Sequence, residues 1–139
     1  MILYRPVGLK ELQLIAESGY KAFPPRLPYQ PIFYPVLTYS YAEQIARDWN
    51  TDDEASGYAG FVTQFDVDDE YVARYEIKTV GGSVHQELWV PAERLGEFNA
   101  HLRGRITVQA SFYGAKFGGQ VDPGTNLPAS ISQIPNALA

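Results

Sequence analysis

Two segments in which apolar and polar residues alternate constrain the fold of this chain most strongly. The first spans residues 105–112 and the second spans 61–67. The apolar residues of the first segment are Ile106, Val108, Ala110 and Phe112. This period of two is typical of a β-strand with one face in a core and the other in water, as in antiparallel sheets. The sequence therefore predicts an antiparallel sheet at the centre of the fold.

Three segments have the signals of helices. The first is expected within 8–19, because its apolar residues recur at helical spacing and a glycine follows its end. The second is expected to begin at Ser40, because Ser40 and Glu43 have the spacing of a capping box. The third is expected within 91–104, which opens on a proline and closes on a glycine.

Further strands are expected at 2–7, 32–37, 71–77 and 84–90, with a turn at the glycine pair before the last of them. The order is β-α-β-α, followed by three or four strands that one helix interrupts. This order predicts an α+β fold: a single compact domain with a mostly antiparallel sheet and about three helices.

The length of 139 residues suits one domain. We expect residues 1–116 to form it, and residues 117–139 to form a C-terminal tail of low charge, rich in Gly, Pro, Ser and Asn. This tail either is mobile or packs over the domain, with Ile131, Ile134 and Leu138 as anchors.

Composition excludes several classes of protein. The chain has no cysteine, so it has no disulfide, thiolate nucleophile or sulfur-ligated metal. A net charge of −5 argues against nucleic acid as the main partner. No apolar run approaches the roughly 18 residues of a membrane span, and the N-terminal residues lack the layout of a signal peptide. We therefore expect a cytoplasmic protein without a membrane partner, and the spacing of its two histidines predicts no metal site.

The segment 84–90 carries the most informative polar residues. Alternation places His85, Glu87 and Trp89 on one face of the predicted strand, and the opposite face is mostly apolar. A carboxylate beside a large ring can bind hydroxyls or stabilise a developing cation. The alternative is an exposed strand face without a function.

Arg5 and a group of aromatic residues are further candidates. Arg5 lies between two apolar residues of the first strand, where it either extends along an apolar surface or presents its guanidinium to an anion. Phe33 and Tyr34, with Tyr39 and Tyr41 nearby, either pack in the core or form a platform for a flat ligand.

The order of these features resembles the ADP-ribosyltransferase fold over roughly residues 2–112. In chain order, the resemblance is carried by Tyr4-Arg5, a helix that ends at Gly19, Phe33-Tyr34, Tyr41-Ala42, the strand 60–67 and Glu87. The chain also looks like small bacterial proteins labelled as ADP-ribosylation or crystallin-related. That label implies an ADP-ribosyl glycohydrolase, a larger helical enzyme rich in metal-binding aspartates, which the predicted strands and the length do not match.

The resemblance implies a mono-ADP-ribosyltransferase that takes NAD as its substrate, cleaves the nicotinamide–ribose bond and transfers ADP-ribose to an unknown acceptor, such as a protein. Glu87 would be the catalytic glutamate that holds a ribose hydroxyl, and Arg5 would contact the ribose and phosphate of NAD. The residues implied in NAD binding are Arg5, Phe33, Tyr34, Tyr41 and His85. The alternative is a non-catalytic domain of the same fold that binds a nucleotide or a protein partner.

Overall fold

The computed structural model describes residues 1–82 and 85–134, and these form a single α+β domain with antiparallel sheets. The predicted fold class is therefore confirmed. The strands are β1 (Ile2–Val7), β2 (Ile32–Phe33), β3 (Ala59–Val67), β4 (Ile77–Thr79), β5 (Gln86–Leu88), β6 (Val90–Pro91) and β7 (Leu102–Tyr113). The α-helices are α1 (Leu9–Glu17), α2 (Tyr39–Asp48), α3 (Asp69–Val72), α4 (Leu95–Ala100) and α5 (Ala129–Ser132). Short 3-10 turns span Asn50–Asp52, Glu54–Ser56 and Ala92–Arg94.

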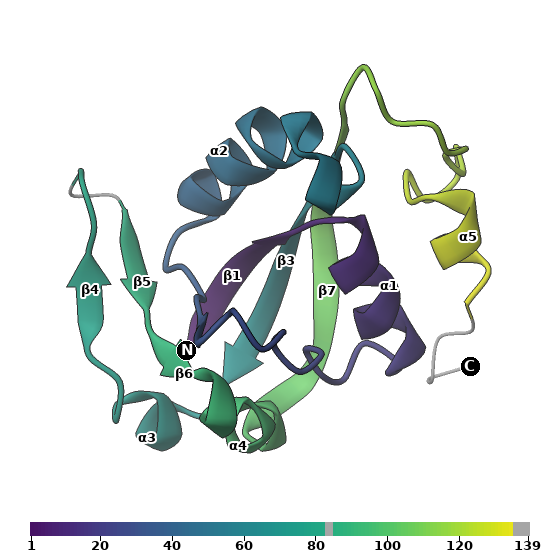
Figure 1. The fold of residues 1–139 in the computed structure, drawn as a ribbon. Helices are drawn as coiled ribbons and strands as arrows, with labels where there is room; N and C mark the ends of the chain where they lie inside the picture. The colour runs from purple at the N-terminus through teal and green to yellow at the C-terminus, as the bar shows by residue number, and fades with distance from the viewer. Residues whose placement is uncertain (83–84, 135–139) are drawn as a thin grey trace.

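The central sheet has the order β1-β3-β7, and both pairings are antiparallel (Figure 1). Val36 extends this sheet beyond β1, because its N–H and carbonyl both hydrogen-bond to Tyr4, at 2.7 and 2.9 Å. On its other side Val36 forms an antiparallel bridge with Glu87 of β5, which pairs with β4. Val36 therefore connects the central sheet to the β4–β5 hairpin, which projects at one side of the molecule (Figure 1).

The helices α1 and α2 pack on opposite faces of β3. Phe61 belongs to the main core with residues of α1, whereas the next residue, Val62, packs with Ala42 and Ala46 of α2. Successive side chains of a strand point to opposite faces, so these two contacts place one helix on each face. Gly60 allows the close approach of α2, because a Cβ atom there would lie 2.1 Å from the carbonyl oxygen of Ala46.

Several local predictions are wrong. The prediction of about three helices missed α3 and α5. Residues 71–77 were expected to form a strand, but the chain forms α3 and then only the short strand β4 from Ile77. Asp68 caps α3 by accepting a hydrogen bond from the N–H of Tyr71 at 3.0 Å, and acidic residues occupy its first turn, where the helix dipole favours them.

The ends of two predicted helices also differ. The cap of α2 is Thr38, whose hydroxyl accepts from the N–H of Tyr41 at 3.2 Å, rather than Ser40. The predicted helix 91–104 is limited to α4 and its preceding turn, and Gly104 lies inside β7 with φ +71° at an irregularity in the pairing with β3. Glycine suits this bulge because it adopts positive φ without a steric cost. By contrast, α1 ends as predicted, with Gly19 at φ 78° just after it.

The described part of the C-terminal segment packs against the domain. Ile131 of α5 is 1% exposed and belongs to the main core, and Ile134 packs against the same cluster. The hydroxyl of Tyr113 donates to the carbonyl of Asn126 at 2.8 Å. Of the two expected arrangements, packing over the domain therefore holds for residues 117–134, and the third predicted anchor, Leu138, lies outside the described residues.

Candidate functional site

Strand β5 and the residues next to it expose a carboxylate between aromatic side chains. Leu88 and Val90 are buried in the core, whereas Glu87 is half-buried and Trp89 is 42% exposed. The predicted alternation of this segment is therefore confirmed from Glu87 to Val90. Val84, which was predicted to face the core, lies outside the described residues.

Two donors hold the carboxylate of Glu87. The Tyr41 hydroxyl donates to Oε2 at 2.9 Å, and the Trp89 indole Nε1 donates to Oε1 at 2.8 Å. A carboxylate oxygen can accept more than one hydrogen bond, so both oxygens of Glu87 keep capacity for a further donor such as a sugar hydroxyl. Tyr41 and Trp89 therefore fix the orientation of the carboxylate, which can still bind a hydroxyl group.

The backbone brings these three residues together. The carbonyl of Pro35 accepts from the N–H of Leu88 at 2.9 Å, and the N–H of Leu37 donates to the carbonyl of Gln86 at 3.0 Å. These bonds fix β5 beside the segment that leads into α2. Tyr41 lies in the first turn of α2 and so reaches Glu87, although the two residues are 46 positions apart.

Other predicted residues lie around the carboxylate. The ring of His85 stacks on that of Tyr41, with centroids 4.6 Å apart and an interplanar angle of 29°. The ring of Tyr34 meets that of Trp89 edge to face at 6.3 Å. We name this group the Glu87 cluster; its members are Tyr34, Tyr41, His85, Glu87 and Trp89.

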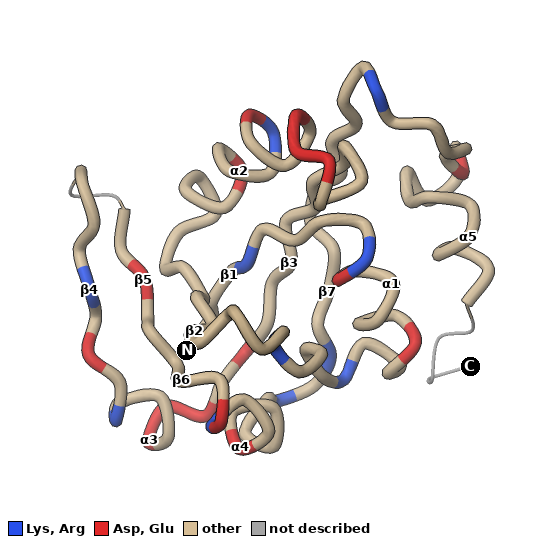
Figure 2. Tube along the Cα trace, in the orientation of Figure 1, with Lys and Arg blue, Asp and Glu red and all other residues tan. Residues whose placement is uncertain are grey.

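A lysine that the sequence analysis did not consider borders the cluster. Lys78 of β4 pairs in register with Glu87 of β5, and its Nζ lies 5.3 Å from the centre of the Trp89 ring. Figure 2 shows this basic position on β4 beside the acidic one on β5. Facing positions of a hairpin can be found from the sequence once the turn is placed, so the glycine pair at 81–82 was the available signal.

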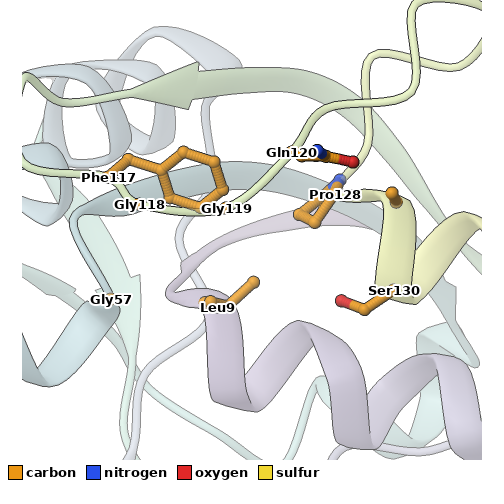
Figure 3. Close-up of a pocket in the computed structure, with 9 residues that line it drawn as sticks. Leu9, Gly57, Phe117, Gly118, Gly119, Gln120, Pro128 and Ser130 are labelled. Carbon is orange, nitrogen blue, oxygen red and sulfur yellow. The ribbon is translucent and has the colours of Figure 1, made fainter.

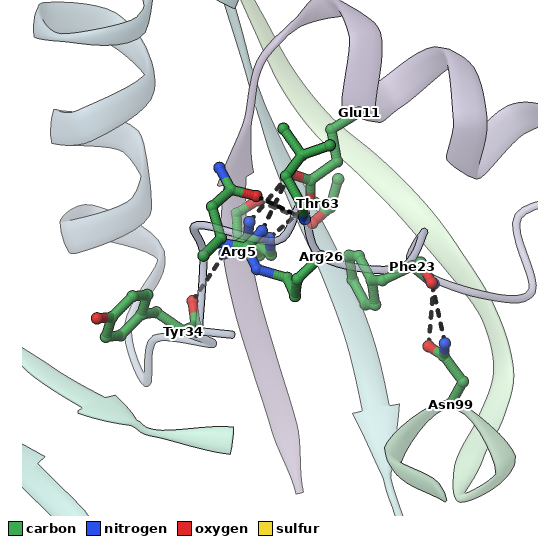
Figure 4. Close-up of polar contacts among 9 residues, drawn as sticks. Arg5, Glu11, Phe23, Arg26, Tyr34, Thr63 and Asn99 are labelled. Atoms are coloured by element: carbon green, nitrogen blue, oxygen red, sulfur yellow. Dashed lines mark hydrogen bonds and ion pairs between the residues drawn. The ribbon is translucent and has the colours of Figure 1, made fainter. Parts of the chain in front are cut away.

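Of the two arrangements expected for Arg5, the structure has the one in which the guanidinium faces an anion, and this anion is the carboxylate of Glu11. It is buried, with 8% exposed, and its Nε and Nη2 donate to both oxygens of Glu11, at 2.6 and 3.0 Å. Its Nη1 donates to the carbonyl of Tyr34 at 3.2 Å (Figure 4). Its guanidinium lies over the ring of Phe33, 4.6 Å from the ring centroid. Arg5 therefore contacts the backbone of the Glu87 cluster from the interior.

Phe33 lies in the core rather than in the Glu87 cluster. It is 1% exposed and packs against Phe23 and Phe98 at centroid distances of 5.0 and 5.5 Å. The adjacent Tyr34 is 39% exposed. Of the two predicted uses of these aromatic residues, Phe33 has the structural one and Tyr34 is accessible to a ligand.

The acidity of Tyr41 depends on the cluster. Burial and the hydrogen bond to Glu87, in that order, raise the pKa of Tyr41 to about 12 from its ordinary value of 10.0. Because the pKa of Tyr41 is higher in the folded chain than in the unfolded chain, this residue contributes to the stability of the fold below pH 10. The contribution is lost as the pH rises through 12.

We therefore predict a late-titrating tyrosine that disappears in Tyr41→Phe. When the absorbance near 295 nm is followed against pH, the difference between the wild-type and the variant should increase with a midpoint near pH 12. In Glu87→Gln the midpoint should fall but stay above 10, because burial, the larger cause, remains. A wild-type midpoint near pH 10 would contradict the described environment of Tyr41.

Two cavities of the described residues lie away from the Glu87 cluster. The larger has a volume of about 370 Å³ and lies between the start of α1, Gly57 and the C-terminal segment, with Leu9, Phe117 and Ser130 in its lining (Figure 3). No titratable side chain lines it, so it offers no acid or base to a reaction. The Glu87 cluster is therefore the better candidate for chemistry.

Within the described residues, no group of three or more potential ligand side chains could hold a metal ion, and no helix is long and apolar enough to cross a membrane. In the comparisons with known proteins, no family model, curated protein or solved structure matches this chain. The residues of the Glu87 cluster are therefore the basis on which we assign a function.

Proposed function

We propose that this chain is an ADP-ribosyltransferase-like enzyme that takes NAD as its substrate and that Glu87 is its catalytic residue. The observation that carries the proposal is the Glu87 carboxylate, held by Tyr41 and Trp89 on a surface lined with aromatic rings. The resemblance in the order of residues described above supports the same assignment.

The proposed reaction breaks the bond between the nicotinamide nitrogen and the ribose C1′. The nitrogen keeps the electron pair and leaves as neutral nicotinamide, so positive charge develops on the ribose. A fixed carboxylate near the ribose stabilises this charge more than it stabilises the ground state. A nucleophilic atom of the acceptor then bonds to C1′ and releases its proton to solvent.

The aromatic side chains around Glu87 could bind the nicotinamide ring. Trp89 and Tyr34 are both accessible and meet edge to face, and Tyr41 is stacked with His85. Rings of this kind bind flat heterocycles by stacking. In the proposal, one of these rings contacts the nicotinamide while Glu87 accepts a hydrogen bond from a ribose hydroxyl.

Arg5 has a positioning role in this proposal. Its guanidinium joins Glu11 of α1 to the carbonyl of Tyr34 and so fixes the chain that carries the Tyr34 ring. Its bidentate contact with Glu11 leaves little capacity for a phosphate. The phosphate contact that the resemblance implies for Arg5 is therefore proposed for another residue below.

A calorimetric titration with NAD tests the binding step and separates the proposal from the alternative. We expect the wild-type protein to bind NAD with a dissociation constant below about 1 mM, in the usual range for enzymes and their substrates. Trp89→Phe keeps an aromatic ring but removes the Nε1 donor, so it should bind NAD nearly as well and cleave it more slowly. Binding without release of nicotinamide would favour a non-catalytic nucleotide-binding domain. If the protein does not bind NAD at millimolar concentration, neither an enzyme that cleaves NAD nor a non-catalytic domain that binds NAD is supported.

A further inference from the structure

Arg26 belongs to the proline-rich segment 24–35, and its side chain lies beside that of Arg5, largely covered but still in part exposed to solvent (Figure 4). Its side chain is 12% exposed, and its Nη1 is 4.0 Å from Oε1 of Glu11. Its Nε is buried without a hydrogen-bond partner among the residues that the structure describes. A guanidinium has five N–H donors, and a buried donor left unpaired is costly. Among the described residues, the Nε of Arg26 therefore lacks an acceptor.

Glu11 cannot supply that acceptor without leaving Arg5. Both of its oxygens already accept from Arg5, at 2.6 and 3.0 Å. Two guanidinium groups thus share one carboxylate, which leaves one positive charge in excess. Burial and the neighbouring Arg5 both lower the pKa of Arg26, as expected for a cation without a full counter-charge.

We propose that Arg26, with Arg5 behind it, binds a phosphate group. The planar guanidinium matches the spacing of phosphate oxygens and donates two parallel hydrogen bonds to them. A phosphate also supplies the missing negative charge and the missing acceptor. We name the cluster of Arg5, Glu11 and Arg26 the anion site.

The anion site is continuous with the Glu87 cluster. Arg5 donates to the carbonyl of Tyr34, the ring of Tyr34 contacts Trp89, and Trp89 donates to Glu87. We identify the bound group as the pyrophosphate of NAD, an identification that rests on the proposed function, whereas the phosphate site itself does not.

The test compares three ligands by calorimetry at constant ionic strength: inorganic pyrophosphate, NAD, and nicotinamide riboside, which has no phosphate. Arg26→Gln is expected to weaken the binding of pyrophosphate and of NAD about tenfold or more, the usual effect of losing a charged hydrogen bond. Its binding of nicotinamide riboside should be unchanged. Arg74→Gln is the matched control, because Arg74 also lies 4.0 Å from a carboxylate, that of Glu97, but is 63% exposed. It should bind all three ligands like the wild-type.

One further variant separates a loss of the site from a loss of the fold. Arg26→Lys retains the charge without the planar guanidinium and should bind pyrophosphate with intermediate affinity, which also guards against misfolding of Arg26→Gln. The anion site is overturned if the wild-type does not bind pyrophosphate, or if Arg26→Gln binds pyrophosphate and NAD as the wild-type does. Pyrophosphate binding that depends on Arg26, in a protein that does not cleave NAD, would support the anion site and contradict the proposed function alone.

Discussion

Replacement of Glu87 by Gln is expected to reduce the release of nicotinamide from NAD by about 100-fold or more, because a neutral amide cannot stabilise the positive charge that develops on the ribose. Binding of NAD should change much less, since the aromatic rings and the anion site are untouched. The measurement is the rate of nicotinamide release, followed by mass spectrometry at saturating NAD.

The fold of this variant should be intact. Glu87 is half-buried, and an amide of the same size still accepts from Tyr41 or Trp89 at one of its atoms. Glu43→Gln is the control, because Glu43 is a partly exposed carboxylate on α2 that forms an ion pair with Arg47 at 3.6 Å. Full activity of Glu87→Gln, or an equal loss in Glu43→Gln, would show that Glu87 is not the catalytic residue.

The second large effect concerns stability. Glu11→Ala is expected to lower the free energy of unfolding by about 3 kcal/mol, because it leaves Arg5 buried without its counter-charge. This value is at the lower end of the range for breaking a buried ion pair, since the side chain of Glu11 is 20% exposed. Unfolding in urea at pH 7 measures it.

An exposed glutamate of the same helix provides the comparison for Glu11. Glu17 of α1 is exposed and accepts a hydrogen bond from the side-chain amide of Gln13, at 3.1 Å. Glu17→Ala should therefore change the free energy of unfolding by less than about 0.5 kcal/mol. If the two variants lose equal stability, the Arg5–Glu11 pair has no special role in the fold.

Helices and strands could be predicted from the sequence where the apolar residues recur with a period that fits only one of the two. Alternation of apolar and polar residues marked β3 and β7 as strands. The alternation did not reveal that β3 is buried on both faces, where Phe61 and Val62 pack in different clusters. The segment 71–77 was misread because a separation of four residues satisfies both the strand and the helix period. Tyr71 and Tyr75 contact each other across a helical turn and its end, with their hydroxyl oxygens 2.6 Å apart. The acidic residues before Tyr71 were the signal that favoured a helix.

The contacts within the site could be predicted only in part. Strand alternation placed Glu87 and Trp89 on one face, but the bond from Tyr41 depends on the bridge through Val36, which no local pattern reveals. The partner of Arg5 is just six residues away, yet it lies on the next element, beyond the turn at Gly8. Sequence reasoning missed Arg26, since a residue in a proline-rich segment gives no signal that its side chain turns inward.

Incubation of the wild-type protein with NAD, followed by quantification of free nicotinamide, tests the proposed function most directly. Glu87→Gln, prepared in the same way, supplies the background rate. The proposal predicts that nicotinamide forms in the wild-type reaction well above this background. Equal rates of nicotinamide formation in the two reactions, at NAD concentrations where calorimetry shows binding, would contradict it.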